Sequence, residues 1–263
     1  MIYIIEWFKN LNPILQGLLA TTFTYLVTAF GASLVFFFKN INRKVLDLMM
    51  GFAAGVMIAA SFWSLLSPAI ELAQSLGRTG ITENGLGFLF GGLLIIVSDI
   101  LLQKRVNVDS KTKRSILLTS SVTLHNIPEG MAVGVAFGTL ALGVPGVTLI
   151  GAVLLALGIG IQNFPEGVCV AMPLRGEGVS RKKAFFIGQA SGIVEPIAGV
   201  LGVIFALIIQ NILPFLLSFS AGAMIAVVCL ELVPESFKHN KVVASIGVLV
   251  GFIVMMSLDV GLG

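Results

Sequence analysis

Eight long apolar segments, separated by short connections that carry charged or turn residues, dominate this sequence. A helix needs about 20 mostly apolar residues to cross a bilayer, and every segment reaches that length. Only 11% of the residues are charged and 57% are hydrophobic, so a soluble fold could not cover its surface. The sequence therefore predicts an all-α polytopic membrane protein, with residues 1–263 forming one transmembrane domain. The predicted spans cover approximately residues 11–38, 45–70, 84–103, 115–140, 146–174, 184–209, 211–237 and 242–261.

The basic residues predict how these spans are oriented. Of the 16 Lys and Arg residues, 14 lie in the connections after the first, third, fifth and seventh spans, and only Lys9 and Arg78 lie on the opposite side. Since cytoplasmic loops are enriched in Lys and Arg, we expect the 14 to face the cytoplasm and both termini to face outside. The charged runs are short and isolated, so the sequence indicates the lipid bilayer as a partner and no nucleic acid.

Acidic residues inside the predicted spans carry most of the functional information. An unpaired carboxylate in the bilayer core costs at least about 2.5 kcal/mol, and every Lys and Arg lies in a loop or at a flank. Neutral acids that donate hydrogen bonds between helices could explain one or two such residues, but not six. We therefore expect a bound cation to supply the missing positive charge. The acids are Asp99, Glu129, Glu166, Glu195, Glu231 and Asp259, with Glu235 at the border of a span.

Two of these acids belong to a motif repeated near the middle of the fourth and fifth spans. In each copy a ligand-capable side chain lies four residues before the Glu, and therefore on the same helix face. The prolines remove a backbone N–H donor, which membrane helices tolerate where the backbone lines a polar cavity. Matching motifs on antiparallel helices near the midplane indicate a central binding site. The copies read His125-Asn126-Ile127-Pro128-Glu129-Gly130 and Gln162-Asn163-Phe164-Pro165-Glu166-Gly167.

A third acid, Glu195, is expected at a similar depth in the sixth span, beside Pro196. Imidazole, amide and carboxylate groups together suit Zn²⁺, Fe²⁺, Mn²⁺ or Cd²⁺ better than Cu⁺. Three carboxylates exceed what one divalent ion needs for neutrality, which favours a site for two metal ions. Cys169 lies one turn after Glu166 and could add a soft ligand, although such a cysteine in an apolar helix usually serves packing.

The paired motifs, the eight spans and the predicted outside termini resemble the ZIP (zinc–iron permease) family, particularly its bacterial GufA-like branch. The resemblance covers essentially the whole chain. It implies uptake of a divalent transition metal, zinc foremost and also cadmium, iron or manganese, across a bacterial inner membrane into the cytoplasm. It also implies a 3+2+3 arrangement of helices, often a homodimer, and an elevator-like or rocking motion. The binuclear centre that it implies comprises His125, Asn126, Glu129, Gln162, Asn163, Glu166 and Glu195.

The resemblance also implies a transport path. Ser64 and Asp259, near the outer ends of the second and eighth spans, match entrance positions of the family. Met57 matches a family Met near the midplane, and Asp99 and Glu231 would line the inward exit. Without the family, ordinary helix packing would explain Met57 and Ser64.

The chain departs from many relatives at two points. The connection Lys104–Arg114 is short and contains no His, so capture of metal by that loop is not expected. Gln162 stands where some branches have His, which makes the site poorer in nitrogen and could broaden its selectivity. The other histidine, His239, is expected to be a solvated loop residue at the cytoplasmic flank.

Other functions remain open on the sequence alone. A channel-like facilitator or a proton-coupled exchanger would use the same acids. An intramembrane metal-dependent hydrolase would need an open coordination position and a general base, for which Glu129 is the candidate, but the HExxH spacing is absent. A haem oxidoreductase with two axial histidines would need more than one buried His. We expect a transporter without enzymatic activity or a catalytic cofactor.

Overall fold

The computed structural model describes residues 2–38, 42–105, 110–144, 147–176, 178–208 and 210–262. Within these ranges all regular structure is helical and no strand is present. The helices are α1 (Ile2–Lys9), α2 (Pro13–Ala32), α3 (Arg43–Ala60), α4 (Ser67–Ser75), α5 (Ile81–Arg105), α6 (Ser110–Ala141), α7 (Leu149–Gly176), α8 (Arg181–Ala190), α9 (Val194–Ile208), α10 (Leu213–Val227), α11 (Val233–Ser236) and α12 (Lys241–Leu262). Short helical turns join some of them: η1 (Ser33–Phe36), η2 (Ser61–Leu66), η3 (Ser191–Ile193), η4 (Gln210–Ile212) and η5 (Val228–Leu232).

Seven helical segments in the described part of the chain are long and apolar enough to cross a membrane. They match seven of the eight predicted spans, and the remaining prediction, 115–140, falls within the 32-residue helix α6. The all-α polytopic prediction is therefore confirmed. Lys39, residues 106–109 of the Lys104–Arg114 connection and the side chain of His125 lie outside what the structure describes. The seven segments are Pro13–Phe36, Arg43–Ser75, Ile81–Leu101, Leu149–Gly176, Arg181–Ile208, Leu213–Ser236 and Lys241–Gly261.

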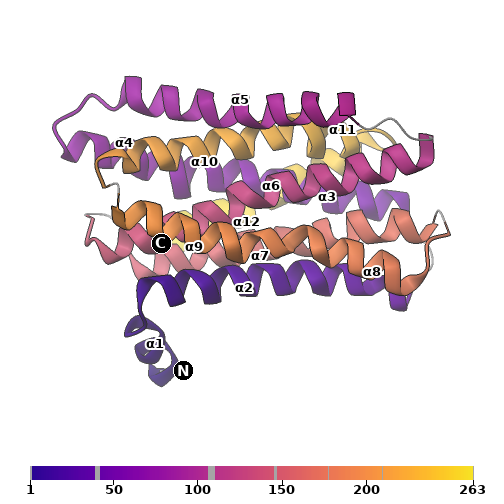
Figure 1. Ribbon diagram of the computed structural model, residues 1–263, viewed down its shortest axis with the longest axis horizontal. Coiled ribbons are helices and arrows are strands. Elements are labelled where there is room, and N and C mark those ends of the chain that lie inside the picture. The colour runs from indigo at the N-terminus through magenta and orange to yellow at the C-terminus, as the bar shows by residue number, and fades with distance from the viewer. Residues whose placement is uncertain are drawn as a thin grey trace.

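The helices associate in two groups. In one group α2 packs along α7 and α6 packs along α9, and in the other α3 packs along α12 and α5 along α10 (Figure 1). Glycines permit these close approaches, because in membranes small residues let helix backbones touch. A Cβ at Gly134 would lie 2.9 Å from the Cα of Gly199, and one at Gly251 would lie 3.1 Å from the Cα of Phe52. The first group carries all the motif residues, so its packing builds the candidate site.

Two spans contain a wider, π-helical turn that the hydrophobic pattern does not reveal. η2 immediately precedes α4, which has Pro68 in its first turn, and η5 immediately precedes α11, which has Pro234 there. Proline cannot donate to the carbonyl four residues earlier and its ring collides with that carbonyl, so the preceding turn opens. Such turns occur frequently at functional sites. Here they contain Ser64 and Glu231, two of the predicted path residues.

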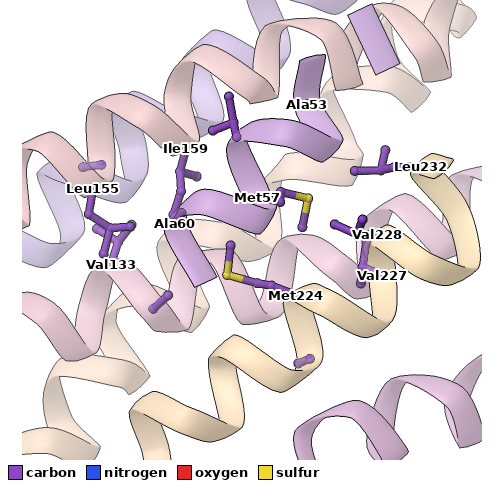
Figure 2. Packing of buried hydrophobic residues seen from close by; sticks show 14 of the residues in the cluster. Ala53, Met57, Ala60, Val133, Leu155, Ile159, Met224, Val227, Val228 and Leu232 are labelled. Carbon is purple, nitrogen blue, oxygen red and sulfur yellow. The ribbon is translucent and has the colours of Figure 1, made fainter. Parts of the chain in front are cut away.

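An apolar interface joins the two groups. Met57 of α3 and Met224 of α10 are both fully buried in one hydrophobic cluster, together with Leu155 and Ile159 of α7 (Figure 2). Small side chains such as Ala60 complete this surface. The structure therefore places Met57 inside the protein, beside Met224 and Val228 of its own group, in a hydrophobic cluster that also includes residues of the group that carries the motifs (Figure 2).

Candidate metal centre

Three helices bring the predicted ligands together inside the first group. Asn126 and Glu129 come from α6, Gln162, Asn163 and Glu166 from α7, and Glu195 from the first turn of α9. The side chains are completely or almost completely buried, with Glu166 the most exposed at 2%. α6 reaches α9 this closely because Gly130 has no side chain: a Cβ there would lie 2.7 Å from the Cα of Glu195.

The two motif acids share one amide. Gln162 Nε2 donates to Glu129 Oε1 and lies 3.5 Å from Glu166 Oε1, so the two carboxylates face a common point. Gln162 and Glu166 are one turn apart on α7, as the spacing predicted, and Glu129 reaches them across the interface with α6. The Oε2 atoms of both acids are buried and have no hydrogen-bond partner among the described residues.

The three side-chain amides of the site all direct their NH₂ groups toward oxygen atoms of the protein. Asn126 Nδ2 donates to the Ser191 carbonyl over 2.9 Å, and Asn163 Nδ2 donates to Glu195 Oε2 over 2.8 Å and to the Thr24 carbonyl over 3.2 Å. Within the described part of the chain, the amide oxygens of Asn126, Gln162 and Asn163 are buried without a donor. With the two carboxylate oxygens, the site thus holds five buried oxygen acceptors that lack a donor in the described structure.

The short turn η3 explains how Asn126 is held. Pro196 cannot donate to the carbonyl four residues earlier, and the chain tightens into a 3₁₀ turn over Ser191–Ile193 before α9 begins. The carbonyl of Ser191, the first residue of this turn, accepts the hydrogen bond from the Asn126 side-chain amide.

Glu195 has a different environment from the other two acids. Both of its carboxylate oxygens have potential donors: Thr24 and Asn163 contact Oε2, and the Thr28 hydroxyl lies 3.4 Å from Oε1 and equally far from the Thr24 carbonyl. Thr24 and Thr28 lie on α2, which was not predicted to belong to the site. The available signal was their i, i+4 spacing, although the same span also contains Thr21 and Thr22.

Within the described residues, metal binding at this site would require the amide oxygens as well as the carboxylates. No group of three His, Cys, Asp or Glu side chains within the described residues could hold a metal ion. His125 lies on α6 one turn before Glu129, but its side chain is outside the described residues. Cys169 is a free, buried cysteine packed in the hydrophobic cluster, in line with the packing interpretation.

A cavity of about 270 Å³ lies at the end of the bundle that is predicted to face outside. It combines residues of several spans, among them Ser64, Glu71, Thr139 and Asp259. The Ser64 hydroxyl donates to Asp259 Oδ1 over 2.7 Å, so the structure joins the two residues that were predicted to form an entrance. Glu71 and Thr139 were not predicted. Leu155 lines the cavity and also belongs to the apolar interface between the two groups.

The opposite end contains the remaining predicted residues. Asp99 and Glu231 are both half-buried, and Glu235 forms an ion pair with Lys238. Asp47 was not predicted; it is 2% exposed and accepts a 3.0 Å hydrogen bond from the backbone N–H of Asn240. Its carboxylate also lies 3.6 Å from His239 Nδ1. The prediction of a solvated His239 is therefore incomplete, since this residue is exposed but contacts a buried acid.

Fold and site together define a polytopic helical membrane protein that buries acids and oriented amides between its helices. The family model described as ZIP Zinc transporter matches residues 103–259. Zinc transporter ZIP11 of Xenopus tropicalis is 40% identical over 96% of this chain and 98% of its own length. Zinc transporter GufA of Myxococcus xanthus is 34% identical, with 94% and 99% covered. Zinc transporter ZIPB of Bordetella bronchiseptica is also 34% identical, with 91% and 79% covered.

The chain belongs to the ZIP zinc transporter family. The family resemblance read from the paired motifs is confirmed, and GufA is among the relatives found. These relatives are named as transporters rather than enzymes, so the intramembrane hydrolase is not supported. The family is one of divalent metal transporters in membranes, which identifies a transported metal ion as the substrate class.

Proposed function

We propose that this protein carries Zn²⁺ into the cytoplasm through a midplane site built on Glu129, Gln162 and Glu166. The main observation in support of this proposal is the set of five buried oxygen atoms for which the described structure offers no hydrogen-bond donor. Leaving a buried acceptor without a partner costs about 1–3 kcal/mol. A cation that accepts electron pairs from several of these oxygens removes that cost for all of them at once.

The chemistry of the donors supports a divalent transition metal. Carboxylate and amide oxygens, together with the His125 imidazole one turn before Glu129, make a nitrogen and oxygen set that suits Zn²⁺, Cd²⁺, Fe²⁺ or Mn²⁺. Two carboxylates balance the charge of one divalent ion. In the proposed centre Asn126 and Asn163 add oxygen ligands, and Glu195 would join them if a second ion binds.

The proposed path begins in the outer cavity. Asp259 and Ser64 attract and partly dehydrate the ion there, and Asp99 and Glu231 receive it toward the cytoplasm, with Glu235 near the exit. The entire ligand set lies on one of the two helix groups, and the hydrophobic cluster that joins the groups includes Leu155 and Ile159 of α7 and Ala60 of α3 (Figure 2). Apolar side chains can slide past one another without separating charges, which supports an elevator-like movement of one group against the other. The proposal also includes that the protein lies in a bacterial inner membrane and forms a homodimer.

The test is metal uptake into proteoliposomes by purified protein, with Zn²⁺, Cd²⁺, Fe²⁺ and Mn²⁺ offered separately. We expect uptake of Zn²⁺ by the unmodified protein and loss of uptake in Glu129→Gln and in Glu166→Gln, each of which keeps the size of the side chain. Glu6→Gln, at an exposed acid of α1, serves as the matched control and should transport normally.

Two results would contradict the proposal. Full uptake by both Gln variants would exclude the midplane site, and the absence of uptake of all four metals, with and without an imposed pH gradient, would exclude the function. Size-exclusion chromatography of each variant establishes that it is folded. Comparing uptake with and without the gradient also separates a proton-coupled exchanger from a facilitator.

A further inference from the structure

Two threonines of α2 lie against the carboxylate of Glu195. Thr24 and Thr28 are four residues apart, so their side chains lie on one face of the helix, and both are fully buried. The Thr24 hydroxyl contacts Glu195 Oε2, and the Thr28 hydroxyl lies 3.4 Å from Oε1. A Cβ placed on Gly192 would lie 3.1 Å from both Glu195 Oε1 and Thr28 Oγ1, so a larger residue there would crowd this contact.

The same carboxylate orients Asn163. Asn163 Nδ2 donates to Glu195 Oε2 over 2.8 Å and to the Thr24 carbonyl over 3.2 Å. Reversing the amide would place its oxygen against both acceptors, so this pair of contacts fixes which end points away from them. The end that points away is Oδ1, one of the five buried oxygens that lack a donor in the described structure.

We propose that Thr24 and Thr28 are positioning residues that hold Glu195, and through it Asn163, in the geometry that metal binding requires. The inference rests on the proposed function, because it concerns the affinity of the same site. It makes α2 a supporting element of a centre whose ligands all come from α6, α7 and α9. Because threonine is a neutral donor, it fixes the carboxylate without cancelling the negative charge that attracts the ion.

In other metal sites too, residues that do not touch the metal hold its ligands in place by hydrogen bonds. Partners that orient a ligand without touching the metal typically change affinity by about 10- to 100-fold when they are removed. The two hydroxyls act on one carboxylate, so their removal should be felt as a loss of metal affinity rather than as a loss of turnover. The lower part of that range applies because Asn163 keeps its contact with the Thr24 carbonyl, which no side-chain replacement removes.

The experiment measures the kinetics of Zn²⁺ uptake into proteoliposomes by Thr24→Val/Thr28→Val, which removes both hydroxyls and keeps the shape of both side chains. We expect KM to rise about tenfold, equivalent to about 1.4 kcal/mol, while kcat changes less than twofold. Thr24→Ser/Thr28→Ser retains both hydroxyls and should restore the original KM. Thr28→Val alone removes only the longer contact and should raise KM about threefold.

Thr21→Val is the matched control. Thr21 is a fully buried threonine on the same helix, and its hydroxyl donates to the Gly17 carbonyl of its own helix over 2.7 Å. We expect its KM to be unchanged. The single variant Thr28→Val keeps the test decisive if the double variant does not fold.

A double-mutant cycle tests whether the threonines act through Glu195. In a Glu195→Gln background, replacing both threonines with valine should add less than twofold to KM, because residues that act as one unit are not additive. An unchanged KM in Thr24→Val/Thr28→Val or in Thr28→Val, or an equal rise in Thr21→Val, would overturn the inference. Loss of uptake in Glu129→Gln shows in the same assay that the proposed function itself still stands.

Discussion

The contact between α6 and α9 at Gly130 allows the most quantitative prediction. In Gly130→Ala the new Cβ would lie 2.7 Å from the Cα of Glu195 and 3.0 Å from its carbonyl carbon. Ordinary contacts of a Cβ begin at 3.4 Å, so the Cβ and this Cα must separate by 3.4 − 2.7 = 0.7 Å, and the Glu195 carbonyl oxygen, which is nearer still, requires more. The neighbour is backbone and cannot rotate away, so the helices themselves must move apart.

This separation is large compared with what a metal site tolerates. Metal–ligand distances hold to within about 0.2 Å, and the movement carries Asn126 and Glu129 on α6 away from Glu195 on α9. We therefore predict a rise of about 10- to 100-fold in KM for Zn²⁺ uptake, the range seen when the support of metal ligands is altered. The assay is uptake into proteoliposomes at a series of Zn²⁺ concentrations.

Gly85→Ala is the control for this prediction. A Cβ at Gly85, on α5 of the other helix group, would meet no atom within 4 Å, so uptake should remain normal. Gly134→Ala tests the same interface one turn away from the ligands, where the Cβ would lie 2.9 Å from the Cα of Gly199. The reasoning is refuted if a folded Gly130→Ala protein takes up Zn²⁺ with the original KM.

Three further predictions use the same uptake assay. Uptake should weaken as the pH on both sides falls from 7 to 5.5, because carboxylates and imidazole must lose their protons to bind a metal; stronger uptake in acid would contradict this. Asp259→Asn keeps a partner for Ser64 but removes a charge from the outer cavity. The KM for Zn²⁺ should therefore rise about threefold at low salt and less at 0.5 M salt, where charges are screened. An equal rise at both salt concentrations would exclude electrostatic attraction of the ion by Asp259. Gln162→His adds a nitrogen ligand and should shift preference from Mn²⁺ toward Zn²⁺ by about tenfold; an unchanged Zn²⁺ to Mn²⁺ ratio would exclude Gln162 as a ligand.

The sequence predicted the helices and the core of the site because both depend on local patterns. Apolar length indicated the spans, and the i, i+4 spacing placed Gln162 and Glu166 on one face of α7. Carboxylates without basic partners then led to Glu129 and Glu195, and the structure brings all four side chains into one buried cluster. The predicted outside termini and the 3+2+3 arrangement stay predictions.

The missed residues depend on contacts between distant segments. Threonine in an apolar helix usually bonds to a carbonyl of its own helix. Thr21 does so, and Thr24 and Thr28 also lie within reach of carbonyls of α2, so their i, i+4 spacing alone does not connect them with the site. Asp47 lies near the start of the predicted span 45–70, close to Arg43 and Lys44, and was not named among the functional acids, whereas the fold buries it against the backbone of Asn240. The π-helical turns do not alter the hydrophobic pattern, so only the prolines that follow them could have indicated them.

The most direct test of the central claim is a crystal structure of the protein soaked in Zn²⁺, with the ion located by its anomalous scattering. We predict a peak bound by oxygens of Glu129 and Glu166, with metal–oxygen distances of about 2.0–2.2 Å, and loss of that peak in Glu129→Gln/Glu166→Gln. Zn²⁺ bound only in the outer cavity near Asp259, or a midplane peak that survives in the double variant, would contradict a metal site built on these two acids.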